Sequence, residues 1–399
     1  MVGVFQVVVA RCGPALQRAL VAVFDLWYRS RRSRLPAVSW VVGPNEVANM
    51  VSQFAAVIPG STTAVIVNHP FYPGPYDHHP PELKNRFATL RWRWLTLPAM
   101  FVRLAYSADG FIYLSQNGYL LNLHDHRHFE FGYLQRHGVK IVCCFTGSDI
   151  RSPALMREHE RQTGLPNIAT YLASTDPVFG TAAYDAERKQ IAEVAERFAD
   201  EILTFRVDQM GYLSRSTQPF PYLIPDEAVR EDLEKFESVP VPVILHAPSS
   251  PIIKGTQLVR SAIAALRADG FEFEYVELSG VPHAEVMSEL ERAHIVLNEF
   301  YSHAPGVFAV EAMASGCVVL TSADENVEPD LPAGSNHAWI VTRHWEVYRN
   351  LRAVLERPES LRAQADAGRA WVRANAVTSE SGARIRGILG RITGKGEVD

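Results

Sequence analysis

The chain has 399 residues, 47% of them apolar and 21% charged, and its formal net charge is −5. This length exceeds one ordinary domain and suits two of similar size, each with its own core. The negative balance argues against a nucleic-acid partner. The four cysteines (Cys12, Cys143, Cys144 and Cys317) lack metal-type spacing and fit buried thiols in a reducing cytosol.

Residues 1–36 form an extension ahead of the first domain. Its apolar stretch is interrupted by Arg11, Arg18 and Asp25, so it is too broken to span a membrane. A basic cluster at 29–34 follows this stretch, whereas a signal peptide has its basic residues first. Two interpretations remain open: an amphipathic helix on an anionic membrane surface, or a solvated helix packed on the protein.

Short apolar runs predict five strands in the first half, at 38–42, 64–68, 110–114, 140–145 and 201–205. Gly43-Pro44-Asn45 reads as a loop after the first strand, and a helix is expected from about Glu46. Prolines gather between about 214 and 240, and this segment predicts a link between two domains. We place the domains at 37–225 and 241–399, with a linker at 226–240.

The strand and helix pattern then starts again. Strands are expected at 243–247, 273–278, 294–298 and 317–321, and helices at 256–268, 284–293 and 307–314. Three further helices, at 345–355, 360–374 and 381–392, complete the chain, and one of them could return to the first domain. Alternating strands and helices predict an α/β protein with two doubly wound, parallel-sheet domains facing each other across a ligand-binding cleft.

Two motifs in the second half predict a phosphate and sugar site. Lys254 and Gly255 follow a strand and open a helix, where backbone N–H groups and a positive helix end favour a diphosphate. Pro305, Gly306 and Val307 form a second helix start. Glu311 lies one turn further, among apolar neighbours that make an unpartnered carboxylate costly, and it could accept hydrogen bonds from a ribose diol.

These motifs resemble the retaining GT-B glycosyltransferases of family 4, also called glycosyl transferases group 1. The resemblance rests on Lys254-Gly-Thr, Val-Pro-His283, the strand ending at Asn298, and Gly306-Val-Phe-Ala-Val-Glu311-Ala-Met-Ala-Ser-Gly. In the first half, Thr146-Gly147-Ser148-Asp149-Ile-Arg151 resembles a segment of that family, and Gly43-Pro-Asn45 resembles its first glycine loop. The likeness extends over about residues 38–375.

The resemblance implies a GT-B fold with two Rossmann-like domains and transfer of a sugar from a nucleotide-sugar donor to a glycan or lipid-linked acceptor, with retention. Lys254 would neutralise the leaving diphosphate, Glu311 would hold the ribose, and His303 would face the donor sugar. Further donor contacts would come from Gly43, Gly255, Val281, Pro305, Gly306 and Val307. The acceptor side would include Asn45, His124, Thr146, Gly147 and Asp149. No cofactor, metal or protein nucleophile is expected. The implied setting is cell-envelope or surface polysaccharide synthesis, in the cytoplasm at the inner face of the membrane.

Three positions depart from the family pattern. Ser249 stands where an arginine is usual, His303 where a glutamate is frequent, and Thr146 where a histidine is usual. The alternatives are therefore a non-catalytic relative that binds sugars or partners, and a GT-B sugar-nucleotide epimerase or phosphorylase.

Histidine-rich segments allow a metal interpretation as well. His124, Asp125 and His128 could ligate a metal from one helix face, and Asp77-His78-His79 is a second candidate. We favour a polar or sugar-contacting loop for the first segment, and His69–Tyr72 could line the cleft in the same way. Residues 83–106 mix arginines with tryptophans, a pattern typical of a membrane interface or of a helix with a buried aromatic face.

Overall fold

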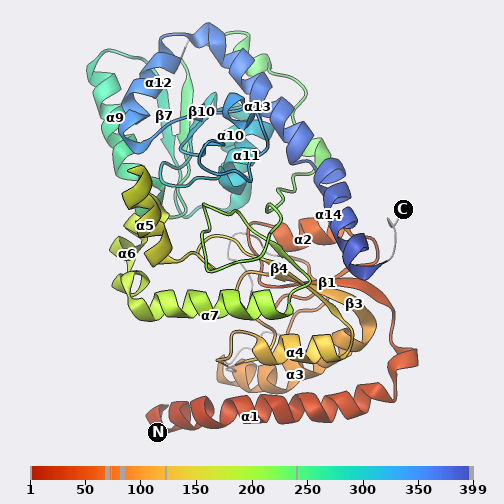
Figure 1. Ribbon diagram of the computed structural model, residues 1–399. Coiled ribbons are helices and arrows are strands. Elements are labelled where there is room, and N and C mark those ends of the chain that lie inside the picture. The colour runs from red at the N-terminus through yellow and green to blue at the C-terminus, as the bar shows by residue number, and fades with distance from the viewer. Residues whose placement is uncertain are drawn as a thin grey trace.

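The structure is a computed structural model, and it describes residues 2–67, 72, 74–80, 86–121, 124–239 and 241–394. Side chains are described from residue 13 onward in the first helix and from residue 92 onward in the third. Figure 1 shows two α/β units stacked one above the other, the first domain below and the second above.

The first domain is built on a five-stranded parallel sheet in the order β2-β1-β3-β4-β5. Its strands are β1 (Val38–Pro44), β2 (Thr62–Thr63), β3 (Ala108–Leu114), β4 (Lys140–Cys144) and β5 (Glu201–Leu203). Helices cover both faces, so β4, Lys-Ile-Val-Cys-Cys, is buried at four of its five positions. This burial explains why such strands read as continuous apolar runs rather than alternating ones.

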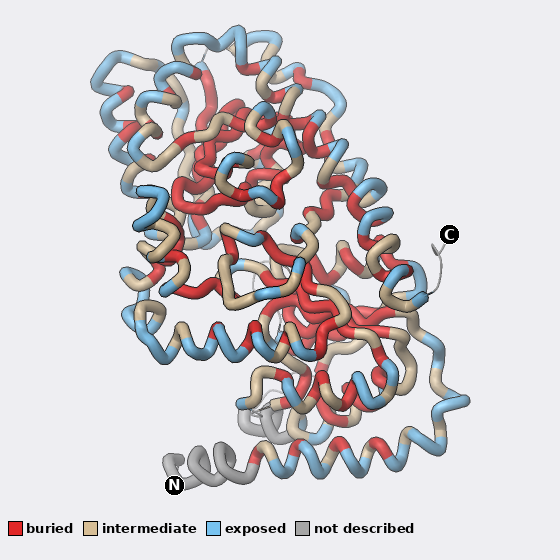
Figure 2. The backbone as a smooth tube through the Cα atoms, in the orientation of Figure 1, coloured by how far each residue is buried: buried red, intermediate tan, exposed pale blue. Residues whose placement is uncertain are grey.

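Seven α-helices belong to the described part of the first half. They are α1 (Val2–Arg29), α2 (Met50–Val57), α3 (Arg86–Ser107), α4 (His128–Arg136), α5 (Pro153–Thr163), α6 (Ile168–Thr175) and α7 (Ala182–Phe198). Helix α1 lies along the lower edge of the molecule, beneath α3 and α4 (Figure 1). Its inner face packs on α3, and its outer face is exposed (Figure 2).

The second domain repeats the same strand order on a second five-stranded parallel sheet, β10-β9-β8-β6-β7. Its strands are β6 (Val243–His246), β7 (Glu274–Glu277), β8 (Ile295–Leu297), β9 (Val318–Thr321) and β10 (Ile340–Val341). Its helices are α8 (Pro251–Lys254), α9 (Thr256–Ala268), α10 (His283–Arg292), α11 (Gly306–Ala314), α12 (Val347–Leu355) and α13 (Leu361–Asn375). In each sheet the strand order reverses between two central strands, and ligands of such sheets bind at the carboxyl ends beside that reversal.

The last helix, α14 (Thr378–Thr393), returns to the first domain and packs beside α2 (Figure 1). Arg386 Nη1 donates to the carbonyl oxygen of Val57 at 3.1 Å, and a Cβ added at Gly382 would lie 2.9 Å from Val57 Cβ. The close approach of the two helices therefore depends on a glycine at this position. The prediction that a terminal helix could cross back is confirmed.

The structure corrects several predicted elements. The segment Gly43-Pro44 belongs to β1 and is not a loop, because it continues the pairing with Tyr113 and Leu114 of β3. Helix α2 starts at Met50 rather than near Glu46. The strand expected at 64–68 is shifted, since β2 is Thr62–Thr63 and only isolated bridges follow at Ala64 and Val67.

Candidate functional site

A cavity of about 310 Å³ lies between the two domains. The first domain contributes Thr146, Gly147 and Ser148 from the loop after β4, and the second contributes Lys254, Gly306 and Val307. The irregular chain that follows β5 in the first domain adds Asp208 and Tyr222. Since residues that are distant in the sequence converge here at the carboxyl ends of parallel strands, this cavity is the candidate donor site.

Lys254 is held at the wall of this cavity by the turn between α8 and α9. Gly255, between the two helices, has φ +75°, a conformation that favours glycine. His246 at the end of β6 reinforces the turn, because its Nε2 lies 2.9 Å from Thr256 Oγ1 while Nδ1 lies 2.7 Å from the carbonyl oxygen of Leu297. Lys254 is thus carried by a turn that hydrogen bonds hold in place.

The ammonium group of Lys254 already has a partner. Its Nζ donates to Glu299 Oε2 at 2.5 Å, and Glu299 is buried just beyond the end of β8. Burial raises the pKa of the Glu299 carboxyl, while the nearby Lys254 charge opposes that rise. A diphosphate entering the cavity would have to compete with Glu299 for this lysine.

The second basic side chain among the described lining residues, Arg151, is also paired. Its Nη2 donates to a carboxylate oxygen of Asp208 at 2.9 Å. Its Nε donates to the backbone carbonyl oxygen of the same residue at 2.7 Å. The other carboxylate oxygen of Asp208 accepts from Ser302 Oγ at 2.7 Å and His303 N at 2.8 Å. The Arg151–Asp208 pair therefore connects the first domain to the loop ahead of α11.

The start of α11 faces the same cavity. Gly306 opens the helix with φ +71°, and its N–H donates to the hydroxyl of Tyr222 at 3.2 Å. Pro305 precedes it, and its carbonyl accepts from Asn298 Nδ2 at 2.8 Å. These contacts fix the helix start, and Gly306 and Val307 line the cavity. Their role as donor contacts stays a prediction.

Glu311 lies further along α11, outside the lining of this cavity. Its Oε1 is 2.9 Å from Nε2 of His283, the first residue of α10. The hydrogen bond to Glu311 raises the pKa of His283, against the effect of burial. Tyr72 of the first domain lies against the same imidazole, with ring centroids 4.8 Å apart. Glu311, His283 and Tyr72 thus form a contact between the two domains.

Asp149, which was predicted for the acceptor side, shapes the loop that carries Thr146. Its Oδ2 accepts from Thr146 N at 2.8 Å, and Oδ1 accepts from Ser115 Oγ at 2.9 Å. Asp149 is buried and does not line the cavity, whereas Thr146 and Gly147 do. Asp149 therefore affects the cavity indirectly, by holding the loop that carries Thr146 and Gly147.

The other predicted site residues lie away from the cavity lining. Gly43 is buried inside β1, where a Cβ would come within 2.0 Å of the carbonyl oxygen of Ala64. Asn45 is buried after that strand, Val281 precedes α10, and His124 lines a separate pocket in the first domain. His69 belongs to a segment outside the described residues.

His303 is buried beside the cavity. It is 1% exposed, and its ring packs against His159 of α5 with centroids 5.4 Å apart. Within the described part of the chain neither ring nitrogen has a hydrogen-bond partner, and burial lowers the pKa of His303 to about 4. In this conformation the imidazole is neutral and enclosed between the domains.

Among the described residues no group of three or more His, Cys, Asp or Glu side chains is placed to hold a metal ion. Asp77 instead bonds Thr62 and Thr63, and His79 Nδ1 lies 2.9 Å from the carbonyl oxygen of Val65. Asp77 and His79 are thus bonded within the first domain, and His124 and Asp125 line a separate pocket there.

Comparison with known proteins agrees with this architecture. Residues 258–385 match the family model described as glycosyl transferase-like. Sucrose-phosphate synthase from Thermosynechococcus elongatus superposes with a TM-score of 0.58 at 11% identity, covering 89% of this chain and 98% of that one. WaaG, a glycosyltransferase involved in lipopolysaccharide biosynthesis, gives 0.54 at 13% identity, covering 90% and 100%. An alpha-glucosyltransferase in complex with UDP-glucose and DNA gives 0.53 at 8% identity, covering 89% and 99%. No curated protein sequence matches significantly.

The chain has the GT-B fold. The predicted resemblance to group 1 GT-B glycosyltransferases is confirmed for residues 258–385, which match the glycosyl transferase-like model.

Sequence reasoning missed both acidic residues in the described lining of this GT-B cavity, Glu299 and Asp208. Each is a buried acid paired to a base. Glu299 could have been noticed, because it is a carboxylate directly after an apolar strand, where a buried charge needs a partner. Asp208 lies in irregular chain after β5, and nothing in its local sequence indicates that it reaches the second domain.

Proposed function

We propose that this protein transfers a sugar, with retention of configuration, from a nucleotide-sugar donor to a glycan or lipid-linked acceptor at an anionic membrane surface. The observation that carries the donor half of the proposal is the interdomain cavity, where Lys254 and the start of α11 meet the Thr146–Ser148 loop. In a complex with UDP-glucose, the alpha-glucosyltransferase of the same fold provides a precedent for such a donor.

The proposed chemistry needs no protein nucleophile. Lys254 would move from Glu299 to the leaving diphosphate, and positive charge placed there stabilises the charge that develops in the transition state. The N-terminal end of α11 would add its dipole at Gly306 and Val307. Glu311 would hold the ribose, and His283, which already bonds one of its oxygens, would orient the carboxylate.

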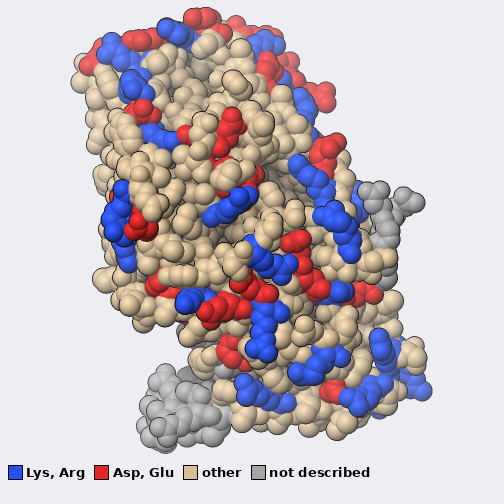
Figure 3. Space-filling view, in the orientation of Figure 1, with Lys and Arg blue, Asp and Glu red and all other residues tan. Residues whose placement is uncertain are grey.

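The acceptor half of the proposal rests on the outer face of α1. Large apolar side chains on this face, Leu16, Val23, Leu26 and Trp27, are exposed. Arg18 and Arg29 are exposed beside them, and the one acidic residue of α1, Asp25, is turned inward to Tyr106, Tyr133 and His137. Figure 3 shows Lys and Arg side chains gathered at the lower right, near the C-terminal end of α1. Exposed apolar and basic residues without exposed acids suit an anionic bilayer surface.

None of the helices in the described ranges is long and apolar enough to cross a bilayer. The proposed attachment is therefore a helix lying on the surface. WaaG, which has the same fold, is a glycosyltransferase involved in lipopolysaccharide biosynthesis, and this supports a role in cell-envelope synthesis.

A non-catalytic relative is the second candidate. It is favoured by the pairing of both basic side chains of the cavity with buried acids, together with Ser249 in place of the usual arginine. Because Arg151 and Lys254 are each paired with an acid, a diphosphate would find little free positive charge in the cavity unless the Lys254–Glu299 pair separates.

A thermal-shift panel with UDP, GDP, ADP and TDP separates the two candidates. A ligand at about 100 times its dissociation constant adds ~2.7 kcal/mol of stability. We expect one nucleotide to stabilise the wild type and to lose that effect in Lys254→Ala. The matched control is Lys189→Ala, an exposed lysine on α7, which should respond like the wild type. No response to any nucleotide would favour the non-catalytic relative.

A further inference from the structure

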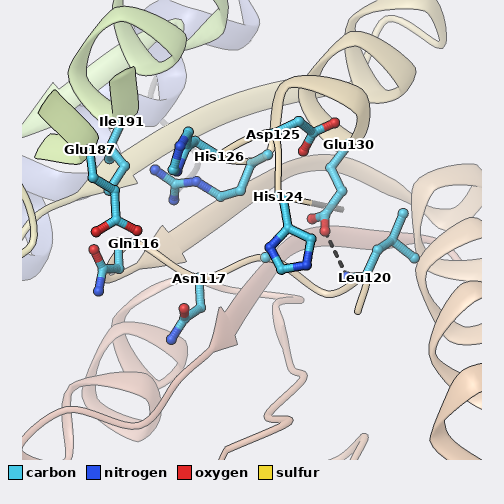
Figure 4. A pocket seen from close by; sticks show the side chains of 11 residues that line it. Gln116, Asn117, Leu120, His124, Asp125, His126, Glu130, Glu187 and Ile191 are labelled. Carbon is cyan, nitrogen blue, oxygen red and sulfur yellow. Dashed lines mark hydrogen bonds between the residues drawn. The ribbon is translucent and has the colours of Figure 1, made fainter. Parts of the chain in front are cut away.

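A pocket of about 670 Å³ lies between helix α14 and the chain that follows β5. Figure 1 shows α14 running from the second domain down to the first. The volume of this α14 pocket is within the 300–1,000 Å³ or so that is typical of small-molecule sites. By contrast, Figure 4 shows a pocket of about 230 Å³ in the first domain whose lining is mainly polar, including Gln116, Asn117 and Glu187.

The α14 pocket has a mainly apolar wall that both domains supply. Its members include Pro219, Pro221, Leu331, Pro332, Trp371 and Ile388. Pro219 is exposed and Pro221 is half-buried, so apolar surface is accessible to an occupant. The one polar atom of the Trp371 side chain is already bonded, because Nε1 donates to Ser335 Oγ at 2.9 Å. This wall therefore suits the apolar body of a ligand.

Helix α14 presents one face to this pocket. Residues on that face recur every three or four positions, at Glu380, Arg384, Gly387, Ile388 and Arg391. Gly387 leaves an opening in the face, since the nearest side-chain atom to a Cβ added there would be Arg391 Nη1, at 3.9 Å. The guanidinium of Arg391 thus folds back over the glycine, at the edge of the pocket.

The charged residues of the described lining differ in their partners. Asp330 is bonded by Arg206 at 2.6 Å, and Arg384 donates to a backbone carbonyl oxygen at the end of α13. Arg391 is exposed and has neither a hydrogen bond nor an ion pair within the part of the chain that the structure describes. Glu380 lies eleven residues earlier, roughly 16 Å along the helix axis. An anion beside Arg391 would therefore be well separated from that carboxylate.

The α14 pocket is separate from the donor cavity, although the two share a wall. Phe205, Phe220 and Tyr222 line both spaces, whereas Lys254 and Gly306 line only the donor cavity. The basic group available to an occupant of the α14 pocket is thus not the one proposed to bind the donor diphosphate.

We infer that the α14 pocket binds an amphipathic anion of small-molecule size. The apolar body of this ligand would lie between α14 and the chain after β5, and its acidic head would bond Arg391. Arginine binds acidic groups through several N–H donors held in one plane, and such charge-assisted hydrogen bonds are stronger than neutral ones. The inference does not depend on the proposed function, since it uses neither the donor nor the acceptor.

A matched pair of fluorescent probes tests the acidic head. Anilinonaphthalene sulfonate and phenylnaphthylamine share the same rings, but only the first is an anion. We expect the sulfonate to bind the wild type more tightly than the neutral probe. Arg391→Gln should weaken sulfonate binding roughly tenfold, because a charge-assisted hydrogen bond is lost, and should leave the neutral probe unchanged. Arg362→Gln, at an exposed position of α13 outside the lining, is the matched control.

A second variant tests the apolar body. Gly387→Phe places a ring in the opening of α14 and should weaken the binding of both probes roughly tenfold or more, since the space is then filled. The helix itself tolerates this change, because phenylalanine is a better helix former than glycine. Ala264→Phe, at an exposed position of α9, is the control. Unchanged far-UV circular dichroism and melting temperature show that each variant is folded.

The outcomes separate this inference from the proposed function. Both probes should bind Lys254→Ala like the wild type. The inference is overturned if the sulfonate does not bind, if Gly387→Phe binds both probes like the wild type, or if Arg391→Gln binds the sulfonate like the wild type. A nucleotide response without probe binding would overturn this inference and leave the donor proposal intact.

Discussion

At the residue scale, the distinctive feature is the pairing of Lys254 with Glu299. The two are 45 positions apart, and the glutamate is buried at the end of β8 while the lysine faces the cavity. A lysine paired in this way is held in position before the donor arrives. The same pairing also weakens its attraction for a diphosphate.

The first prediction concerns Glu299→Gln, which removes the competing charge. We expect the nucleotide selected by the thermal-shift panel to bind roughly tenfold or more tightly, because a charge interaction near a protein surface is worth ~1–4 kcal/mol. Glu277→Gln, a carboxylate bonded to Arg260 at the surface, is the control and should not change affinity.

The pH dependence of binding follows from the same pair. Burial raises the pKa of Glu299, so lowering the pH toward that pKa neutralises the carboxylate and releases the Lys254 charge. Wild-type affinity should therefore increase as the pH falls, while Glu299→Gln should bind tightly at every pH. Weaker binding by the variant, measured by isothermal titration calorimetry, would mean that Glu299 assists the donor instead of competing with it.

At the element scale, α1 has two different faces. The inner face places Gln17 against the carbonyl oxygen of Trp94 and Asp25 against two tyrosines and a histidine. The two interpretations of the extension are therefore compatible, since one face packs on the protein and the other is free. The sequence could not separate them, because a helix with apolar residues on both faces leaves its packed side undetermined.

The second prediction compares two tryptophans that are almost equally exposed, Trp27 on α1 at 55% and Trp345 just before α12 at 57%. We expect Trp27→Glu to reduce flotation with anionic liposomes severalfold, because it places a negative charge on the proposed membrane face. Trp345→Glu lies at the opposite end of the molecule and should float like the wild type. Equal flotation of all three proteins would remove α1 as the membrane contact.

At the scale of the whole molecule, the domains are joined by more than the linker. Asp208 bridges Arg151 to the loop before α11, and Glu328 of the second domain accepts from the backbone N–H groups of Val207 and Asp208. Helix α14 adds a second connection, beside α2. The shape of the cavity depends on these contacts.

The third prediction is that Asp208→Ala lowers the free energy of unfolding by about 3–5 kcal/mol, because it leaves Arg151 buried without its counter-ion. Asp232→Ala removes a surface ion pair with Arg230 and should cost under ~1 kcal/mol. Both values come from urea denaturation followed by far-UV circular dichroism. A loss below ~1 kcal/mol for Asp208→Ala would show that the bridge is dispensable for the fold.

The sequence by itself determined the two α/β units and most of their elements. The predicted helix 256–268 coincides with α9, and most of the predicted strands match within one or two residues. Parallel strands buried on both faces read as apolar runs, and helices carry a period of 3.6, so both are encoded locally. Helices α5, α6 and α7 and the short β10 were not predicted, although α7 is rich in the strong helix formers Ala, Glu, Lys and Arg.

Only the tertiary structure decided which polar residues meet. It paired Lys254 with Glu299 and Glu311 with His283, and it placed His124 in a pocket away from the donor cavity. It also showed that Gly43 is required by the close packing of β1 on Ala64 and Tyr119. The physical reason is that such contacts depend on how strands and loops from separate parts of the chain pack, and the period of a short segment contains no information about its distant partners.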